Sequence, residues 1–394
     1  MSANKDFKSS TRLVHAGRRS REYHGVVNPP VLHASTILFE NLEALDKASP
    51  FPHGSDFYGR HGTPTRYLLE EAVAELEGGY GTLCVSSGVA AITNSILAFV
   101  KPGDHVLITD STYYPTRNLA NTFLKKFGVE VEYYDPTIGG DISALIRDNT
   151  TVVWCESPGS LTFEMQDIPA IAKAAHAKNA KVLLDNTWAA PTLCRPFELG
   201  VDVSIQAGTK YIVGHSDVMM GTITAATEED FITCKKQVIL SGDSIGPDDC
   251  YLAQRGLRTL NVRLRQHHES GLAIAKWLQG RPEVSRVLHP GLPDDPGHAI
   301  WKRDFIGASG LFSFVLHPVE RPQLAKMVDH MDLFGMGFSW GGFESLLLPS
   351  DPKNIRTATT WNDPGQLVRI HVGLEDTDDL IADLAAGFER LKSA

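Results

Sequence analysis

The sequence lacks the features that mark disulfide-rich, membrane-spanning and nucleic-acid-binding proteins. Its five cysteines are an odd number without paired spacing, and Cys84 and Cys155 lie in apolar runs. This pattern indicates reduced core residues in a cytosolic protein. No apolar run is long enough to cross a bilayer, and residues 1–21 lack the apolar stretch of a signal peptide. The net charge is −10, with both signs interspersed, which disfavours nucleic acid or anionic membrane as a partner.

The chain has 394 residues, enough for two or three domains. Residues 1–60 show little periodicity and are interrupted by prolines, so we predict an extended N-terminal arm with a short helix near 41–47. Such an arm has little core of its own and needs another surface, such as a second subunit. We predict a main domain over 61–256 and a C-terminal domain over 257–394, where the sequence pattern changes.

Short apolar runs alternate with helical patterns through the main domain. This alternation predicts a mostly parallel sheet covered by helices on both faces, an α/β fold. The C-terminal part predicts a smaller α/β unit. The expected strands are 83–85, 106–108, 129–133, 152–155, 182–185, 201–205, 311–316 and 367–373, and the expected helices include 68–77, 169–178, 257–277 and 380–391.

Lys210 follows a strand and lies between apolar segments. Val201, Val203 and Ile205 alternate with polar residues, and Ala207 then begins a stretch of small residues that leads to the lysine. Burial lowers the pKa of a lysine and makes its amine nucleophilic, which suits a Schiff base. The alternative is a surface lysine at a strand end.

Asp185 ends the apolar run 182–185. Ligands of parallel sheets bind beyond the carboxyl ends of the strands, where this carboxylate can pair with a cationic ring nitrogen. A lysine Schiff base with an Asp partner for a pyridinium nitrogen is the pattern expected around pyridoxal phosphate. Asp also ends strands as a turn former, so Asp185 alone does not decide the question.

Three further stretches contain residues that could bind parts of a ligand. Residues 83–91 read as a strand, small residues and a helix start, the geometry that presents backbone N–H groups to a phosphate. Tyr113 follows strand 106–108 and can stack on a flat ring, although Tyr114 beside it leaves the choice open. Arg369 lies amid apolar residues and needs an anionic partner, either a bound carboxylate or an internal salt bridge.

The segment 202–216 resembles the cofactor-attachment signature of the Cys/Met-metabolism pyridoxal-phosphate enzymes, and the resemblance extends from about residue 12 to residue 391. Within that family it is strongest to the bacterial cystathionine β-lyases. It implies fold type I of the pyridoxal-phosphate-dependent transferases, which is aspartate aminotransferase-like. Residues 61–256 would then be the pyridoxal-phosphate-binding domain. The resemblance also implies a homo-oligomer, a tetramer built as a dimer of dimers.

The resemblance assigns the cofactor-binding and catalytic roles. Lys210 would carry pyridoxal 5′-phosphate and act in catalysis, and Asp185 would pair with the ring nitrogen. Tyr113 would stack on the ring and help tune proton transfers. The phosphate would be bound by the amides of Gly88 and Val89, by the hydroxyl of Thr209, and by Tyr58 and Arg60 of a neighbouring subunit.

The resemblance also assigns the substrate site. Arg369 would hold the α-carboxylate of the substrate, helped by Ser339 and Trp340, and Tyr58 would contribute from the partner. Glu156 begins a stretch that resembles a pocket-lining motif of the family, and it is not assigned a catalytic role. No metal is expected, because His267 and His268 are adjacent and point to different faces of a helix.

Two positions depart from the common family pattern. Many relatives have Ser where this chain has Ala207, so Thr209 is expected to supply the side-chain hydrogen bond to the phosphate alone. The γ-acting relatives usually carry Leu where this chain has Trp340. A bulky Trp beside the carboxylate site narrows the pocket, and in this respect the chain resembles the β-lyases. The resemblance therefore implies β-elimination of L-cystathionine or another cysteine thioether to homocysteine or the corresponding thiol, pyruvate and ammonia, in methionine biosynthesis.

Three alternatives remain at this point. The first is a γ-acting enzyme on the same scaffold, namely a cystathionine γ-lyase, cystathionine γ-synthase or methionine γ-lyase. The second is an amino-acid racemase. The third is a pyridoxal-dependent regulator that binds a transcription factor. The sequence does not rank cystathionine against other thioethers.

Overall fold

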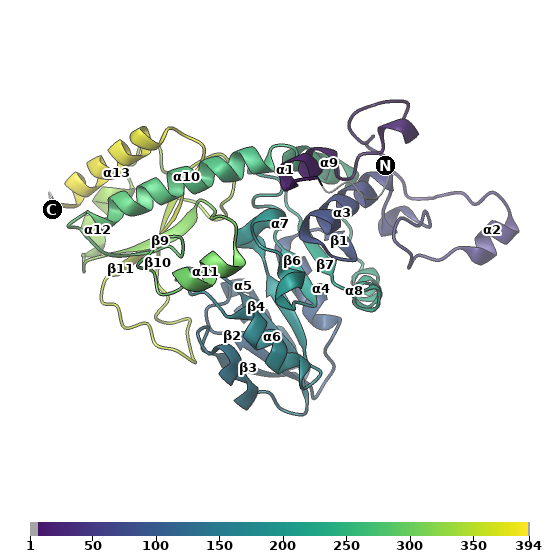
Figure 1. Cartoon of the computed structure of the whole chain (residues 1–394), viewed down its shortest axis with the longest axis horizontal. Coiled ribbons are helices and arrows are strands. Elements are labelled where there is room, and N and C mark those ends of the chain that lie inside the picture. The colour runs from purple at the N-terminus through teal and green to yellow at the C-terminus, as the bar shows by residue number, and fades with distance from the viewer. Residues whose placement is uncertain (1–6, 393–394) are drawn as a thin grey trace.

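The computed structural model describes residues 7–392 and is built around two sheets. Figure 1 shows the larger sheet in the lower part of the molecule and the smaller one beside the C-terminus. In the larger sheet the spatial order is β1-β7-β6-β5-β4-β2-β3. The strands are β1 Gly81–Val85, β2 His105–Thr109, β3 Glu130–Tyr134, β4 Thr150–Glu156, β5 Lys181–Asp185, β6 Val203–Gln206 and β7 Gly221–Ala225.

Six of these seven strands run in the same direction. The pairs from β6 to β3 are parallel, whereas β7 is antiparallel to both β6 and β1. The carboxyl ends of β1, β2, β4, β5 and β6 therefore lie along one edge of the sheet, which is where parallel sheets bind ligands.

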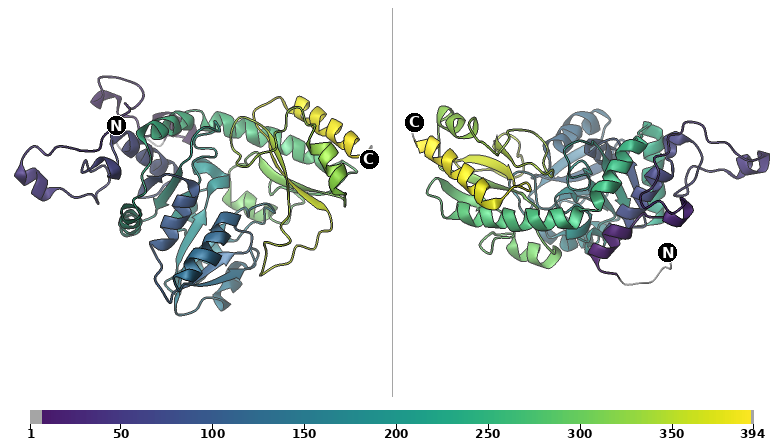
Figure 2. Two further views of the ribbon diagram at one scale, coloured as in Figure 1. Left: turned by 180° about the vertical axis from the view of Figure 1, so that it is seen from behind. Right: turned by 90° about the horizontal axis from the view of Figure 1, so that it is seen from above.

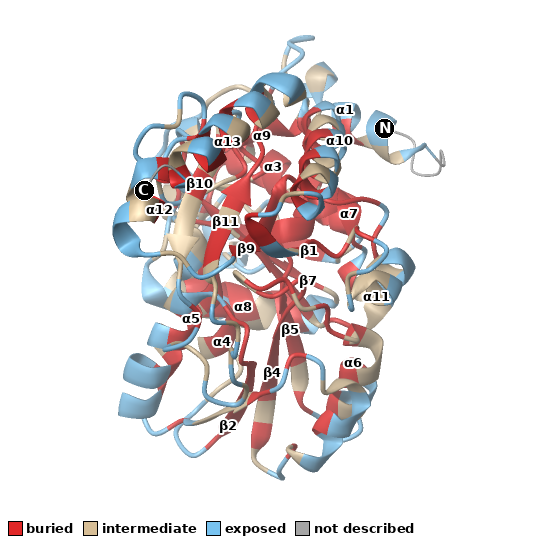
Figure 3. Ribbon diagram, turned by 90° about the vertical axis from the view of Figure 1, so that its left-hand side faces the viewer, coloured by how far each residue is buried: buried red, intermediate tan, exposed pale blue. Residues whose placement is uncertain are grey.

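Both faces of the larger sheet are buried, because successive residues of its strands pack into different clusters. Val106 packs on the face covered by α4 and α8, whereas Leu107 packs on the face covered by α6. Figure 3 shows these central strands as buried and the outer surfaces of the helices as exposed. The helices of this part are α3 Pro64–Glu77, α4 Gly88–Leu97, α5 Tyr114–Asn118, α6 Ile168–His176, α7 Ala190–Leu193, α8 Glu228–Ser241 and α9 Pro247–Leu257, with π-helix 119–124 and 3₁₀ turns at 139–144, 187–189 and 196–199.

The C-terminal part is a second α/β unit. Its antiparallel sheet has the order β10-β11-β9-β8 and packs against α10, α12 and α13. Figure 2 shows the long helix α10 running from the larger part of the molecule to the C-terminal end. The strands are β8 Val284–Leu288, β9 Leu311–Leu316, β10 Leu346–Ser350 and β11 Gln366–His371, and the helices are α10 Leu260–Gln279, α11 His298–Asp304, α12 Arg321–Val328 and α13 Thr377–Lys392.

The N-terminal arm starts on the body of the molecule, where Leu13 is buried, and its later part, around residues 42–47, extends away from it (Figure 1). It contains α1 Ser9–His15 and α2 Leu42–Lys47, with 3₁₀ turns at 20–22 and 59–61. Asn41 caps α2 by accepting a hydrogen bond from the amide of Ala44, 2.9 Å away. Leu38 and Leu42 on this arm are 89% and 70% exposed, so the arm leaves apolar surface without cover in the single chain.

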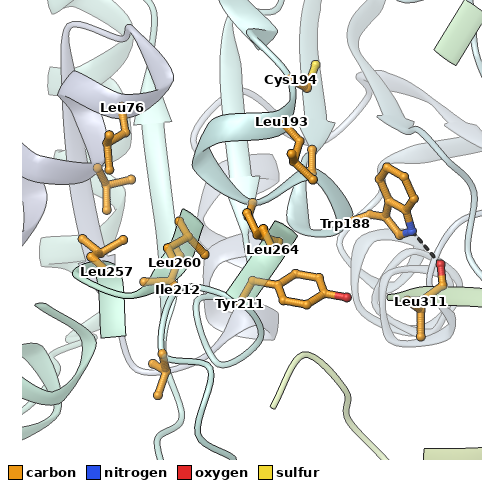
Figure 4. Packing of buried hydrophobic residues seen from close by; sticks show 14 of the residues in the cluster. Leu76, Trp188, Leu193, Cys194, Tyr211, Ile212, Leu257, Leu260, Leu264 and Leu311 are labelled. Carbon is orange, nitrogen blue, oxygen red and sulfur yellow. Dashed lines mark hydrogen bonds between the residues drawn. The ribbon is translucent and has the colours of Figure 1, made fainter. Parts of the chain in front are cut away.

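A cluster of buried hydrophobic residues connects the larger part of the molecule with the C-terminal part. It includes Tyr211 and Trp188 from the larger part and Leu264 and Leu311 from the C-terminal part (Figure 4). The indole of Trp188 donates to the carbonyl of Leu311 over 2.9 Å, the bond drawn in Figure 4. Apolar burial and this buried hydrogen bond thus fix the two units against each other.

The α/β fold with a mostly parallel sheet and a smaller α/β C-terminal unit is confirmed. The predicted final helix is also confirmed, since α13 buries Leu380, Leu384, Phe388 and Leu391. The helix predicted over 257–277 is confirmed as α10, which begins three residues later, at Leu260, because α9 ends at Leu257. The domain boundaries near residues 60 and 256 stay a prediction. Within residues 7–392, no helix is long and apolar enough to cross a membrane.

Candidate active site

A pocket of about 290 Å³ lies where the parallel strands end and the C-terminal unit covers them. Its size suits a small molecule rather than a polymer. Most of the predicted site residues line it, although they come from positions 88 to 369 of the chain. Those in the lining are Gly88, Val89, Tyr113, Asp185, Thr209, Lys210, Ser339, Trp340 and Arg369.

Lys210 enters the pocket from a tight turn after β6. Its backbone N–H donates to the carbonyl of Ala207, and its carbonyl accepts from the amide of Gly214. Its Nζ donates to the hydroxyl of Ser339 over 2.7 Å and lies 5.4 Å from the centre of the Trp340 ring. Burial, and to a lesser extent the charge of Arg369, lowers the pKa of Lys210 to about 8. A larger share of this amine is therefore neutral and nucleophilic near pH 8 than for an exposed lysine.

Asp185 is a buried carboxylate at the end of β5. It accepts hydrogen bonds from the amide and the hydroxyl of Thr187, at 3.1 and 2.5 Å. Burial raises the pKa of Asp185, while the Thr187 bonds and the charge of Lys210 act in the opposite direction. A buried carboxylate of this kind is stabilised by a cation, which a protonated ring nitrogen provides.

Glu156 is a second buried carboxylate, aligned with Asp185 across the β4–β5 pair. It accepts from the amide of Tyr113 over 2.6 Å and from the hydroxyl of Thr112 over 3.1 Å. Burial and the neighbouring Asp185 raise the pKa of Glu156 well above its usual range. Glu156 holds the backbone of Tyr113 beside the pocket. Glu156 lines the pocket, as its resemblance to a pocket-lining motif implied; no catalytic role was assigned to it, although an acid at the end of a neighbouring strand was a usable signal.

The start of α4 presents backbone amides to the pocket. Ser87 caps this helix, because its side chain accepts from the amide of Ala90 and its carbonyl from the amide of Ala91. The preceding amides, of Gly88 and Val89, have no partner within the helix, so they are donors for an anion. A Cβ on Gly88 would lie 2.5 Å from the Cβ of Ala207, so only glycine fits this close approach.

The hydroxyl of Thr209 is engaged within the protein. It donates to the carbonyl of Met220 over 3.1 Å and accepts from the amide of Met220 over 2.9 Å. Because a hydroxyl has one proton, Thr209 would have to leave the Met220 carbonyl to donate to a phosphate. Its expected role at the phosphate stays a prediction.

Arg369 lines the pocket from β11. Its Nη2 donates to the carbonyl of Ser339 over 3.1 Å, and burial lowers its pKa. Within residues 7–392, no carboxylate lies close enough to form an ion pair with Arg369. The internal salt bridge considered from the sequence is therefore not formed, and the guanidinium is available to an anionic ligand.

Tyr58 and Arg60 do not line the pocket of their own chain. Tyr58 is 41% exposed, and Arg60 donates through Nη1 to the carbonyl of Ile239 on α8, 2.9 Å away. Their expected action in the site of a neighbouring subunit stays a prediction.

Comparisons with known proteins agree with this geometry. The family model described as Cys/Met metabolism PLP-dependent enzyme matches residues 10–389. A cystathionine beta-lyase of Salmonella typhimurium is 48% identical over 98% of this chain and 99% of its own length. An L-alanine/L-glutamate racemase of Wolbachia pipientis is 44% identical, covering 98% of each chain.

Among solved structures, a cystathionine gamma synthase of Xanthomonas oryzae pv. oryzae, in complex with aminoacrylate and cysteine, has a TM-score of 0.90. It is 32% identical and covers 99% of this chain and 100% of its own. The family match, the near full-length relatives and the lysine–carboxylate pocket lead to one conclusion. The chain belongs to the Cys/Met metabolism PLP-dependent enzyme family.

Proposed function

We propose that the protein is a carbon–sulfur lyase that converts L-cystathionine and water to homocysteine, pyruvate and ammonia, a step of methionine biosynthesis. The observation that carries the proposal is the 48% identity to a cystathionine beta-lyase along nearly the whole chain. Trp340 supports β- over γ-elimination. Its ring packs 5.5 Å from that of Tyr211 and lies beside Lys210, so it narrows the space near the amine.

The pocket residues fit pyridoxal phosphate. Lys210 supplies an amine of lowered pKa, and Asp185 supplies a buried carboxylate that forms no ion pair within residues 7–392. The amides of Gly88 and Val89 supply donors for the phosphate at the start of α4. These features match the requirements of the cofactor for an amine, a partner for the ring nitrogen and an anion site.

When bound, pyridoxal phosphate supplies an electron sink that stabilises negative charge at the substrate Cα. Asp185 would keep the ring nitrogen protonated, and Tyr113 would stack on the ring and help tune proton transfers. Arg369 binds the α-carboxylate, with Ser339 and Trp340 beside it.

Lys210 performs the proton transfer. Its Nζ, with a pKa of about 8, removes the proton from Cα as a general base. The Cβ–S bond then breaks, and the thiolate of homocysteine leaves with its electron pair. Hydrolysis of the remaining three-carbon fragment gives pyruvate and ammonia, which balances the one water consumed.

We propose further that the enzyme is a cytoplasmic homotetramer, a dimer of dimers, in which Tyr58 and Arg60 of each chain complete a neighbouring pocket. The apolar surface exposed at Leu38 and Leu42 supports association through the arm. All five cysteines are buried free thiols, which supports a reducing compartment.

The test is incubation of purified enzyme with L-cystathionine, followed by identification of the products. We expect homocysteine and pyruvate, and no turnover by Lys210→Ala. Cysteine and 2-oxobutyrate would instead identify γ-cleavage. Full turnover by Lys210→Ala would overturn the assignment of Lys210.

The Wolbachia relative supports one alternative, an amino-acid racemase on the same pocket. A racemase removes the Cα proton and returns it from the other face without breaking a Cβ bond. Formation of D-alanine from L-alanine at rates that rival cystathionine cleavage would favour this alternative.

A further inference from the structure

We infer that His371 is a positioning residue that holds the loop 339–344, which carries Ser339 and Trp340 of the proposed substrate-carboxylate site. Its Nε2 accepts a hydrogen bond from the amide of Gly341 over 3.1 Å, and its Nδ1 donates to the carbonyl of Glu344 over 3.1 Å. The inference rests on the proposed assignment of Arg369 and Ser339 to the substrate carboxylate.

His371 and Arg369 lie on the same face of β11, because they are two residues apart on one strand. Arg369 binds the carbonyl of Ser339, while His371 binds the amide of Gly341 and the carbonyl of Glu344. Strand β11 therefore holds the segment 339–344 at three points.

The segment needs these constraints because its backbone is unfavourable. Ser339 has a φ of +77°, which is rare for a residue with a side chain and persists only where the surroundings impose it. Gly341 has a φ of +87°, and a Cβ there would lie 3.0 Å from the backbone of Lys210. The loop thus packs directly on the turn that carries the amine.

The hydrogen bonds of His371 fix its tautomer. A carbonyl only accepts, so Nδ1 carries the proton, and Nε2 is left as the acceptor for the amide of Gly341. The ring is 1% exposed and packs 5.2 Å from that of His267. Burial and His267 keep the pKa of His371 well below its usual range, so the ring stays neutral and Nε2 remains an acceptor.

Removal of His371 would leave the amide of Gly341 without its buried acceptor. Ser339, two residues earlier, would then lose part of the support for its left-handed backbone, and its carbonyl would no longer orient the guanidinium of Arg369. The effect should fall on recognition of the carboxylate rather than on the chemistry at Lys210.

The experiment compares His371→Leu, His371→Asn and His371→Gln as holoenzymes, by titration with L-alanine and with ethylamine, which lacks only the carboxylate. Cofactor absorbance reports binding. A Gln side-chain oxygen reaches about as far as Nε2 and can accept from Gly341, whereas Asn reaches only to the level of Nδ1. The matched control is His289→Leu, because buried His289 also accepts from a glycine amide, that of Gly291, and does not line the pocket.

We expect His371→Leu and His371→Asn to raise the Kd of L-alanine by about 10- to 100-fold, and that of ethylamine by less than about twofold. His371→Gln should recover most of the affinity, and His289→Leu should change neither Kd by more than about twofold. With cystathionine, KM should rise while kcat stays within about threefold.

Equal weakening of both ligands, or unchanged L-alanine binding in His371→Leu and His371→Asn, would overturn the inference. If His371→Leu does not fold, the comparison of His371→Asn with His371→Gln decides, and equal Kd values for L-alanine in these two variants would also overturn it. Because L-alanine has no thiolate to lose, its binding tests the loop independently of the β-lyase assignment. Failure of cystathionine cleavage by the wild type would contradict only that assignment.

Discussion

Replacement of Lys210 by Met should stabilise the cofactor-free protein at pH 7. The pKa of Lys210 is about 8 in the folded protein and 10.5 for an exposed lysine. Each pKa unit corresponds to about 1.4 kcal/mol, so keeping the buried ammonium costs about 3 kcal/mol. Met also loses the bond to Ser339, a loss of about 1–2 kcal/mol. The net expectation is a gain of about 1–2 kcal/mol in the free energy of unfolding.

The gain must depend on pH. Below pH 8, Lys210 is protonated in both the folded and the unfolded chain, so folding carries the full free-energy cost of burying its ammonium group there. Between pH 8 and 10.5 the unfolded chain binds more protons than the folded one, so the wild type gains stability as pH rises. At pH 9.5 the cost has fallen by about 2 kcal/mol, and the advantage of Lys210→Met should vanish.

Urea denaturation of the cofactor-free proteins at one protein concentration, at pH 7 and pH 9.5, measures these differences. Lys210→Arg is the matched control, because it keeps the charge and should show no gain at either pH. A Lys210→Met variant that is less stable than the wild type at pH 7 would refute the reasoning. An advantage that is the same at both pH values would refute it equally.

Three other predictions concern the phosphate end, the junction of the two units and the ring nitrogen. Gly88→Ala should weaken cofactor binding by about 10- to 100-fold in absorbance titrations, because its Cβ would meet that of Ala207, and Ala207→Gly in the same chain should restore binding. Asp110→Asn should lower the free energy of unfolding by about 3–5 kcal/mol in urea titrations, since the buried carboxylate accepts from Arg117 and from the backbone of residues 357–359; a loss below about 1 kcal/mol would contradict this. Asp185→Asn should lower kcat/KM by about 100- to 1,000-fold in steady-state assays at an unchanged urea midpoint, and unchanged turnover would exclude a role at the ring nitrogen.

The sequence was sufficient to predict the principal pocket residues because their positions follow from strand ends. Lys210 and Asp185 come after apolar runs of a parallel sheet, and parallel strands end at one edge. Strand β7 was not predicted, although Thr222–Ala225 alternates polar and apolar residues, because this run is short and begins at a glycine. Its antiparallel course also required knowledge of the turn that brings Met220 back to Thr209.

Other features depended on contacts between segments that are distant in the sequence. His371 acts on a loop about 30 residues earlier in the chain, and its apolar surroundings gave no sign of that partner. The hydroxyl of Thr209 was expected to serve a phosphate, but whether it is already bonded depends on the position of Met220. Glu156 is different, because the strand-end rule that selected Asp185 applies to it equally well.

The most direct test of the account is the site at which the cofactor attaches. Borohydride reduction of the holoenzyme, followed by peptide mass spectrometry, would fix the cofactor to the lysine that holds it. We predict that the pyridoxyl-phosphate mass is found on the peptide containing Lys210 and is absent from Lys210→Ala. The same mass on another lysine, or on no peptide of the wild type, would contradict the central claim that Lys210 faces Asp185 across the cofactor site.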